Sequence, residues 1–213
     1  MSAAQKGRFI TLEGGEGAGK STQIRLLQDA LENAGRTVIC TREPGGSPGG
    51  EAIRELLVKG DADWEPLTEA LLNYAARHEH LEKVILPTLA DGTWVLCDRF
   101  ADSTMAYQGY GYGMNREVIR RLHRLVVDEV TPDLTLIFDM PVDEGLKRAV
   151  ARGDGEDRYE RMGKDFHERL REGFLEIAKK DPARCAVIDA TGDIGAVAMA
   201  VHDAVMSKLR IDL

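Results

Sequence analysis

The chain has 213 residues, with 43% apolar and 30% charged side chains, which excludes a disordered or collagen-like protein. A chain of this length buries about 70% of its unfolded surface around one core, which favours a single domain over residues 1–213. Lys and Arg number 28 against 36 Asp and Glu, and the net charge of −8 has the wrong sign for a sequence-independent nucleic-acid coat. Any phosphate that this protein binds must therefore be met by a local site.

Five short apolar runs predict buried strands, and they lie at residues 9–13, 38–41, 93–97, 134–139 and 186–189. None of the five alternates apolar and polar residues, so we expect helices to cover both faces of the sheet along every strand.

Between these runs lie segments with apolar residues at spacings of three and four, which predict helices. They cover residues 22–34, 50–59, 64–90, 116–130, 143–151, 164–181 and 194–209. Strands that alternate with helices predict an α/β fold, here a parallel five-stranded sheet wrapped by helices on both faces. Ligands of such sheets bind beyond the carboxyl ends of the strands, where Gly14, Arg42, Asp98 and Asp139 stand in this sequence.

Cysteine use and the N-terminal sequence both favour a cytoplasmic protein. Cys40, Cys97 and Cys185 are far apart and beside aliphatic residues, which predicts reduced thiols in the core and no disulfide. The first eight residues are polar and lack the apolar stretch of a signal peptide. No segment is long and apolar enough to span a membrane.

Residues 14–21 read Gly-Gly-Glu-Gly-Ala-Gly-Lys-Ser and fit the pattern G-x-x-x-x-G-K-[ST] between a strand and a helix. Small residues let backbone amides wrap a phosphate, Lys20 adds a positive charge, and the Ser21 hydroxyl can reach Mg²⁺. The alternative, a glycine-rich turn with a chance Lys-Ser, is disfavoured by the flanking elements. We expect ATP to contact Gly14, Gly15, Glu16, Gly17, Ala18, Gly19, Lys20, Ser21 and Thr22.

Two charged residues, Asp98 and Arg99, directly follow the third strand. Asp98 could bind Mg²⁺ as a second protein group beside Ser21, and Arg99 could bind a phosphoryl oxygen. The alternative is that the two residues form an ion pair at the surface. Four residues shortly after Arg99 in the sequence supply hydrogen-bonding groups and an aromatic ring within one short segment. This composition is typical of a base-reading pocket or of a capped helix end. These residues are Ser103, Thr104, Tyr107 and Gln108.

Residues 148–161 contain four arginines among glycines and acidic residues. This composition predicts either a solvated loop or a mobile charged lid. In a lid, Arg148, Arg152 or Arg158 would clamp the transferring phosphoryl group, a contribution worth about 10³-fold or more in rate.

Two histidines offer no metal site. His78 and His80 are two apart on a predicted helix, so they point to different faces and are both expected at the surface. A stripe of Leu and Val over residues 118–126 is expected to form core or a subunit contact.

Taken together, these motifs resemble the thymidylate kinase family, the nucleoside monophosphate kinases that use ATP and Mg²⁺ to convert dTMP to dTDP. The resemblance runs along nearly the whole chain. It rests on the motifs at residues 9–23, 41–46, 75–77, 98–109 and 157–160.

By this resemblance, Glu16 looks like the acid that contacts the 3′-hydroxyl of dTMP, and Arg99 looks like the group that holds its phosphate. Arg77 and Thr104 look like the groups that read thymine, and the ring of Tyr107 would obstruct a ribose 2′-hydroxyl. The substrate-binding set implied by the resemblance is Glu16, Arg77, Arg99, Ser103, Thr104, Tyr107 and Gln108.

The resemblance also places the catalytic arginine in the lid. Gly17 occupies a loop position that is Arg in one branch of the family, so the clamp is expected from residues 148–161 instead. Arg152 is the first candidate and Arg158 the second, and with Lys20 and Arg99 they form the expected catalytic set.

One position departs from the family pattern. Members commonly have Phe four residues before the base-reading arginine, where it stacks on thymine, and this chain has Asn73. Tyr74, Phe100 or no ring at all are the alternatives. The family further implies a homodimer through helices within residues 64–90 and 116–130.

Two rival functions stay open from the sequence. A kinase on the same scaffold with another acceptor would differ in what Glu16, Arg77 and Thr104 recognise. A nucleotide-dependent switch without an acceptor is the other rival, although the chain has no Asn-Lys-x-Asp guanine-reading signature.

Overall fold

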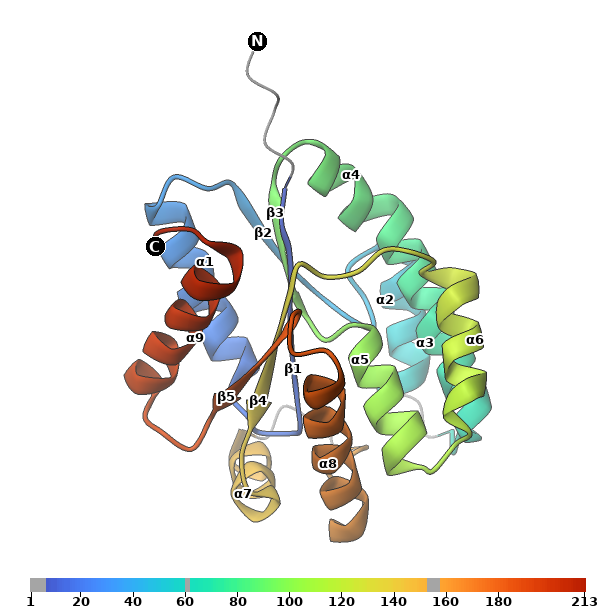
Figure 1. Cartoon of the computed structure of the whole chain (residues 1–213). Helices are drawn as coiled ribbons and strands as arrows, with labels where there is room; N and C mark the ends of the chain where they lie inside the picture. The colour runs from blue at the N-terminus through green and yellow to red at the C-terminus, as the bar shows by residue number, and fades with distance from the viewer. Residues whose placement is uncertain (1–6, 60–61, 153–157) are drawn as a thin grey trace.

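The structure is a computed structural model that describes residues 7–59, 62–152 and 158–213. Its strands are β1 (Phe9–Gly14), β2 (Val38–Arg42), β3 (Trp94–Asp98), β4 (Leu134–Asp139) and β5 (Cys185–Asp189). They form one sheet in the order β2-β3-β1-β4-β5, and every neighbouring pair is parallel (Figure 1). The predicted five-stranded parallel sheet is therefore confirmed.

The helical elements alternate with the strands along the chain, as the sequence predicts. They are α1 (Lys20–Asn33), α2 (Pro48–Arg54), η1 (Glu55–Lys59), α3 (Pro66–His80), η2 (Leu81–Ile85), α4 (Leu86–Ala90), α5 (Ala101–Thr104), η3 (Met105–Gly111), α6 (Arg116–Val126), α7 (Val142–Arg152), α8 (Lys164–Lys180) and α9 (Ile194–Leu209). The elements labelled η are π-helical turns.

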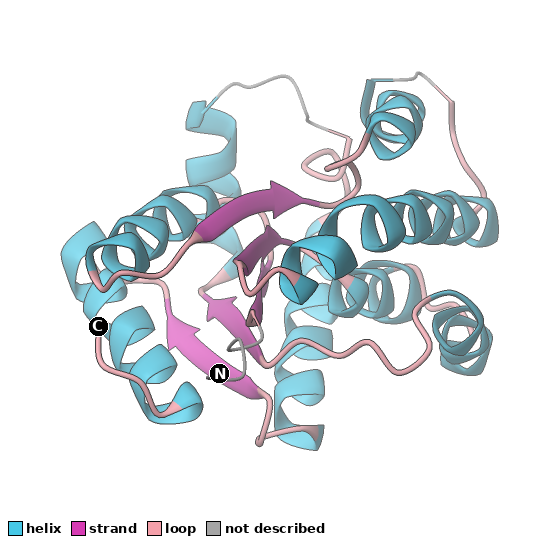
Figure 2. Ribbon diagram, turned by 90° about the horizontal axis from the view of Figure 1, so that it is seen from above, coloured by secondary structure: helices cyan, strands magenta, loops and turns pink. Residues whose placement is uncertain are grey.

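Helices cover both faces of the sheet, which lies between them in the view from above (Figure 2). One face packs on α1 and α9 through a core that includes Ile10 and Leu12 of β1. The other face packs on α3, α4, α6 and α8 through two further apolar clusters. This division leaves the carboxyl edge of the sheet free for a site.

The edge strands differ from the prediction that all five are covered on both faces. β1, β3 and β4 are buried along almost their whole length, whereas β2 has one buried residue and β5 has two, and the others are partly or fully exposed. An edge strand has a neighbour on one side only, so the covering helices reach it incompletely. Cys40 on β2 is exposed, contrary to the predicted core thiol, while Cys97 and Cys185 are buried free thiols.

The predicted helix over residues 64–90 is interrupted by the π-helical turn η2 between α3 and α4. Pro87 stands in the first turn of α4 and has no N–H to donate to the carbonyl four residues back, which explains a change of register there. α6 ends at Val126, four residues before the predicted end, because Asp128 takes a left-handed φ of 53°.

The carboxyl ends of the strands meet at one edge, as predicted. Arg42 pairs in register with Asp98, and Gly14 of β1 pairs with Phe138 of β4. α5 and η3 follow β3 at this edge and were not predicted as helical. The hydrogen-bond donors and aromatic rings of this segment are therefore carried by helical turns and not by an open loop.

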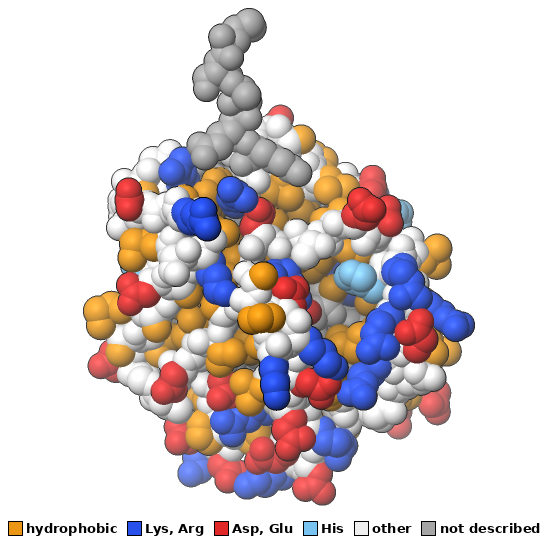
Figure 3. Space-filling model, in the orientation of Figure 1, with side chains coloured by type: hydrophobic (Ala, Val, Ile, Leu, Met, Phe, Trp, Pro, Cys, Tyr) orange, Lys and Arg blue, Asp and Glu red, His pale blue; other side chains and the backbone are white. Residues whose placement is uncertain are grey.

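Charge on the surface is mixed, with Lys and Arg side chains gathered over α6 (Figure 3). Three of the α6 arginines, Arg120, Arg121 and Arg124, form ion pairs with Glu117 on the same helix. None of the helices described combines the length and the apolar character needed to cross a membrane.

Candidate active site

The loop between β1 and α1 is the predicted phosphate cradle, and three of its glycines have positive φ angles. Gly14, Gly17 and Gly19 have φ angles of 137°, 67° and 84°, which side chains rarely allow. A Cβ on Gly17 would lie 1.9 Å from the carbonyl oxygen of Gly145 in α7, so this position requires glycine. The loop borders a hollow of about 510 Å³, the donor cavity, and residues 16–22 line it. Seven of the nine residues expected to contact ATP thus surround one space.

Lys20 is the cation of this cradle. Its Nζ donates to the carbonyl oxygens of Gly14 at 3.1 Å and Gly15 at 2.9 Å. Burial lowers the pKa of Lys20 to about 8, and the nearby charge of Arg99 acts in the same direction. The ammonium is held at the wall of the donor cavity, within reach of a phosphate bound there.

Ser21 and Asp98 offer oxygen ligands beside the cradle. Ser21 Oγ donates to Asp98 Oδ2 at 3.1 Å, and both residues line the donor cavity. The other carboxylate oxygen, Asp98 Oδ1, is buried and has no hydrogen-bond partner among the residues described. A hydroxyl and a carboxylate with a free oxygen fit Mg²⁺, which prefers few protein ligands and keeps several waters. The described residues contain no cluster of three or more His, Cys, Asp or Glu that would suggest another metal.

Arg99 sits at the junction of two cavities. Its own φ is 70°, and its backbone N–H donates to the Leu12 carbonyl oxygen at 2.9 Å. Its guanidinium donates to the Gly14 carbonyl oxygen at 2.9 Å and to both carboxylate oxygens of Glu16 at 3.2 Å. A strained strand end therefore turns this side chain back over the phosphate cradle.

A second hollow of about 120 Å³, the acceptor cavity, adjoins the first. Glu16 and Arg99 line both cavities, so a group bound in one lies next to a group bound in the other. The structure brings together all the residues expected to bind the substrate: Glu16, Arg77, Arg99, Ser103, Thr104, Tyr107 and Gln108 line the acceptor cavity.

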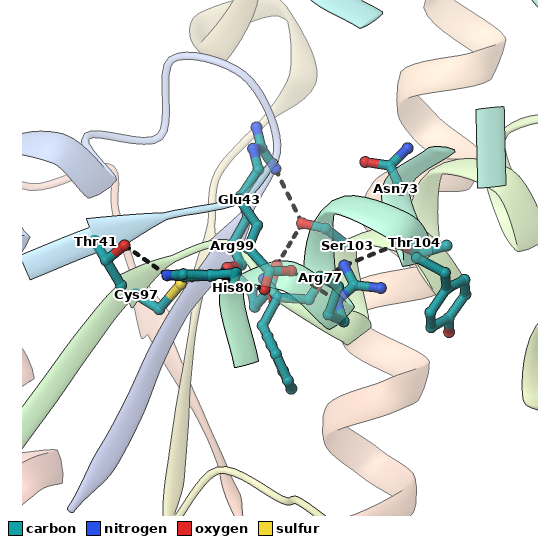
Figure 4. Close-up of polar contacts among 12 residues, drawn as sticks. Thr41, Glu43, Asn73, Arg77, His80, Cys97, Arg99, Ser103 and Thr104 are labelled. Carbon is teal, nitrogen blue, oxygen red and sulfur yellow. Dashed lines mark hydrogen bonds and ion pairs between the residues drawn. The ribbon is translucent and has the colours of Figure 1, made fainter. Parts of the chain in front are cut away.

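Arg77 lines the acceptor cavity, and one of its donor atoms has no partner among the described residues. Its Nε donates to Glu43 Oε2 at 2.7 Å, and its Nη2 donates to the Phe100 carbonyl oxygen and to Thr104 Oγ1 (Figure 4). Its Nη1 is buried and has no partner among the described residues. A buried unpaired donor is costly, so Nη1 is suited to a ligand acceptor.

Aromatic rings surround this guanidinium. Phe100 lines the acceptor cavity together with Asn73, whereas Tyr74 is buried outside the set that lines it. The guanidinium carbon of Arg77 lies 4.7 Å from the Tyr74 ring centroid and 5.2 Å from that of Phe100. Of the two rings considered for stacking in place of the family's Phe, Phe100 is the one in the cavity wall.

Glu16 lies in the wall that the two cavities share. It accepts a hydrogen bond from the Tyr107 hydroxyl. Burial alone would raise the pKa of Glu16, but the charges of Arg99 and Lys20 and the Tyr107 hydroxyl hold that pKa below its ordinary value. The carboxylate is therefore ionised at neutral pH and accepts hydrogen bonds from hydroxyl groups.

Glu69 on α3 is a buried carboxylate that sequence reasoning missed. It binds three side chains that line the acceptor cavity. It accepts from Gln108 Nε2 at 2.6 Å, from Arg158 Nη2 at 2.7 Å and from the Tyr159 hydroxyl. Arg158 thus lines the acceptor cavity and is absent from the residues that line the donor cavity. The position of Glu69, four residues before Asn73 on one helix face, was the available signal.

The expected lid is only partly described. Arg148 lines the donor cavity and donates to the carbonyl oxygens of Ala190 and Thr191. Arg152 is the last residue of α7, and its side chain and residues 153–157 lie outside the described part of the chain.

Sequence reasoning also missed Glu13, Glu43 and His80. Glu13 is buried and accepts from the Phe100 N–H at 2.8 Å and from Ser103 Oγ at 2.5 Å. His80 was expected at the surface but is fully buried between Thr41 and Glu43, while His78 is exposed. The helical spacing of three between Arg77 and His80 places both on one face, which the sequence could have shown.

Comparisons with known proteins agree with this geometry. The sequence model of the family described as "Thymidylate kinase" matches residues 12–201. The chain belongs to the thymidylate kinase family. It is 59% identical over 205 residues to a thymidylate kinase of Caulobacter vibrioides, covering 96% of this chain and 98% of that one. It is 51% identical over 207 residues to one of a Bradyrhizobium strain, covering 96% and 92%.

A solved structure shows the same fold. The crystal structure of thymidylate kinase from Ehrlichia chaffeensis matches with a TM-score of 0.77 and 39% identity, covering 97% of this chain and 99% of that chain. The resemblance inferred from the motifs is thus confirmed at the level of the thymidylate kinase family, and the P-loop kinase architecture is confirmed with it.

Proposed function

We propose that this chain transfers the γ-phosphoryl group of MgATP to the 5′-phosphate of dTMP, giving dTDP and ADP. The observation that carries the proposal is the junction at Arg99 and Glu16, where the donor cavity and the acceptor cavity meet. In-line transfer between two phosphates requires the two binding spaces to be adjacent.

On the donor side, the loop amides and Lys20 bind the ATP phosphates, and Ser21 and Asp98 hold Mg²⁺. When bound, Mg²⁺ neutralises charge on the donor phosphates. Lys20 can leave its two carbonyl acceptors for a phosphate oxygen because those contacts are with neutral groups.

On the acceptor side, Arg99 binds the dTMP phosphate and aligns it with the donor. Arg77 and Thr104 read thymine, with Arg77 Nη1 as the free donor. Glu16 accepts from the 3′-hydroxyl, and the Tyr107 ring, which lines the same cavity, would obstruct a ribose 2′-hydroxyl. Ser103 and Gln108 complete this wall.

No general base is needed, because the acceptor phosphate is already a nucleophile. The transferring group spreads negative charge over its oxygens, and a cation that closes over it lowers the barrier. We assign this clamp to Arg152 of the lid at residues 148–161, with Arg158 second. The contact of Arg158 with Glu69 must open before Arg158 can serve the donor cavity.

The chain is further proposed to act as a cytoplasmic homodimer. α3 exposes Leu67 and Leu71, and α6 exposes Leu125, within the two predicted contact segments. Exposed leucines on neighbouring helices favour burial against a second copy of the chain. Sedimentation equilibrium of the wild type and of a Leu71→Glu variant tests this arrangement: the wild type should sediment as a dimer and the variant as a monomer.

The activity is tested by ADP release with MgATP and each of dTMP, dUMP, UMP, dCMP, dGMP and AMP at one enzyme concentration, with a control lacking acceptor. We expect dTMP to be preferred by a wide margin. Preference for another acceptor would overturn the roles of Arg77 and Thr104 while leaving the phosphate sites in place. If none of the acceptors in the panel raised ADP release above the control, the kinase assignment would be overturned.

A further inference from the structure

A buried chain of hydrogen bonds runs from β2 to the base-reading side of the acceptor cavity (Figure 4). Thr41 Oγ1 lies 2.7 Å from His80 Nε2, and His80 Nδ1 lies 3.0 Å from Glu43 Oε1. The second oxygen of Glu43 accepts from Arg77 Nε at 2.7 Å. The side chains of His80, Glu43 and Arg77 are buried, with residue exposures of 0%, 4% and 2%.

The chemistry of the partners fixes the orientation of the His80 ring. Glu43 forms a buried ion pair with Arg77, so its carboxylate can only accept hydrogen bonds. Nδ1 of His80 must therefore carry the hydrogen in its contact with Glu43. In the neutral ring, Nε2 then accepts from the Thr41 hydroxyl. His80 thereby satisfies one oxygen of Glu43 and leaves the other directed at Arg77.

The loop after β2 packs closely against the same ring. A Cβ on Gly46 would lie 2.3 Å from His80 Nε2 and 2.5 Å from Thr41 Oγ1, so the backbone touches this pair directly. Glu43 of the loop lines both cavities and Pro44 lines the acceptor cavity, whereas His80 is outside the residues that line either cavity. His80 can reach the substrate only through its neighbours.

We propose that His80 is a positioning residue for base recognition, which acts through Glu43 to hold the guanidinium of Arg77 with Nη1 free for the acceptor base. This inference rests on the role of Arg77 given under the proposed function. Loss of the His80 contact leaves one oxygen of Glu43 without its donor, so Glu43 and Arg77 settle in a different arrangement. The effect should fall mainly on dTMP binding, because Arg77 lines the acceptor cavity and is absent from the residues that line the donor cavity, which Glu43 borders as well.

The first experiment compares His80→Leu with His80→Asn. Leucine removes both ring contacts, whereas the asparagine amide can donate to Glu43 from near the place of Nδ1. We expect His80→Leu to raise KM for dTMP about tenfold or more, with kcat and KM for ATP within about threefold of the wild type. His80→Asn should recover most of the loss. His78→Leu, an exposed histidine on the same helix, is the control and should change none of these constants.

Thermal unfolding and circular dichroism of each variant distinguish a folding defect from a specific effect on dTMP binding. If His80→Leu does not fold, His80→Gln replaces it, since its longer amide can meet Thr41 but leaves Glu43 without a donor. Equal KM values for the Asn and Leu variants, or a fall of kcat together with a rise of both KM values, would overturn the proposal.

The second experiment places His80→Leu in an Arg77→Lys background, which keeps a cation beside Glu43 but loses the planar guanidinium. We expect the His80 effect on KM for dTMP to shrink to less than about twofold there, because it passes through Arg77. If Arg77→Lys alone leaves KM for dTMP unchanged, the assigned role of Arg77 fails. If Arg77→Lys raises KM and His80→Leu still multiplies it by its full factor, only the His80 inference fails.

Discussion

Arg99 and Glu16 face each other at the boundary of the donor and acceptor cavities, with Arg99 Nη2 at 3.2 Å from both carboxylate oxygens of Glu16. Each therefore touches the space in which a phosphoryl group would move from donor to acceptor. A phosphate that binds Arg99 must share it with this carboxylate, while a substrate hydroxyl can bind the carboxylate at the same time.

Glu16→Gln tests the hydroxyl contact. The amide keeps the shape but is a weaker acceptor than the ionised carboxylate, so the variant should lose most of its preference for an acceptor with a 3′-hydroxyl. We expect the wild type to favour dTMP over 3′-deoxy-dTMP in kcat/KM by about tenfold or more, and the variant to narrow that ratio severalfold. An unchanged ratio would show that Glu16 does not contact the 3′-hydroxyl.

Lys20→Met removes the cation of the phosphate cradle. The turnover number should fall by about 10²-fold or more, because the transferring phosphoryl group loses a charge contact. The fold should survive, since Lys20 bonds only loop carbonyl oxygens and its charge is penalised by burial. ADP release measures the rate, with Lys83→Met, an exposed lysine, as control. Turnover near that of the wild type would refute the assignment.

Asp98→Asn should weaken the magnesium site without removing the side chain. The free carboxylate oxygen Oδ1 becomes part of a neutral amide, so the Mg²⁺ concentration for half-maximal rate should rise about tenfold. Asp91→Asn, at an exposed turn, is the matched control. The same Mg²⁺ dependence in both variants would place the ion elsewhere.

Much of this fold could be predicted because apolar runs and helical spacing depend on local sequence alone. The strands and the phosphate loop were located within a few residues. The interruption at η2 was missed because the apolar pattern runs through it without a break. α5 and η3 were missed because they are short and their apolar residues are mixed with donors that serve the cavity.

The site was predicted less completely, and the missing part is the buried polar layer. Motifs show residues that point at ligands, such as Arg99 and Lys20. They do not show which polar residues support them, because the burial of Glu69 or His80 depends on segments far away in the sequence. Glu69, for example, is enclosed by Gln108 and Tyr159, which are 39 and 90 residues further along the chain.

Glu13 gives this protein a stability that depends on pH. Burial, together with the charge of Asp102, raises the pKa of Glu13 from its ordinary 4.5 to about 7. Between these values the folded state binds a proton that the unfolded state has released. The contribution of Glu13 to the free energy of unfolding is therefore fully present below pH 4.5 and is lost as pH rises to about 7, by at most about 1.4 kcal/mol per pH unit.

Glu13→Gln imitates the protonated carboxyl, since its amide oxygen can still accept from the Phe100 N–H. The variant should match the wild type in urea unfolding at pH 4 and exceed it in free energy of unfolding at pH 8. Glu82→Gln, at an exposed position, corrects for the general loss of a negative charge. Parallel pH profiles for the Glu13→Gln variant and the wild type would mean that folding does not raise the pKa of Glu13, with Arg99 and Ser103 offsetting its burial.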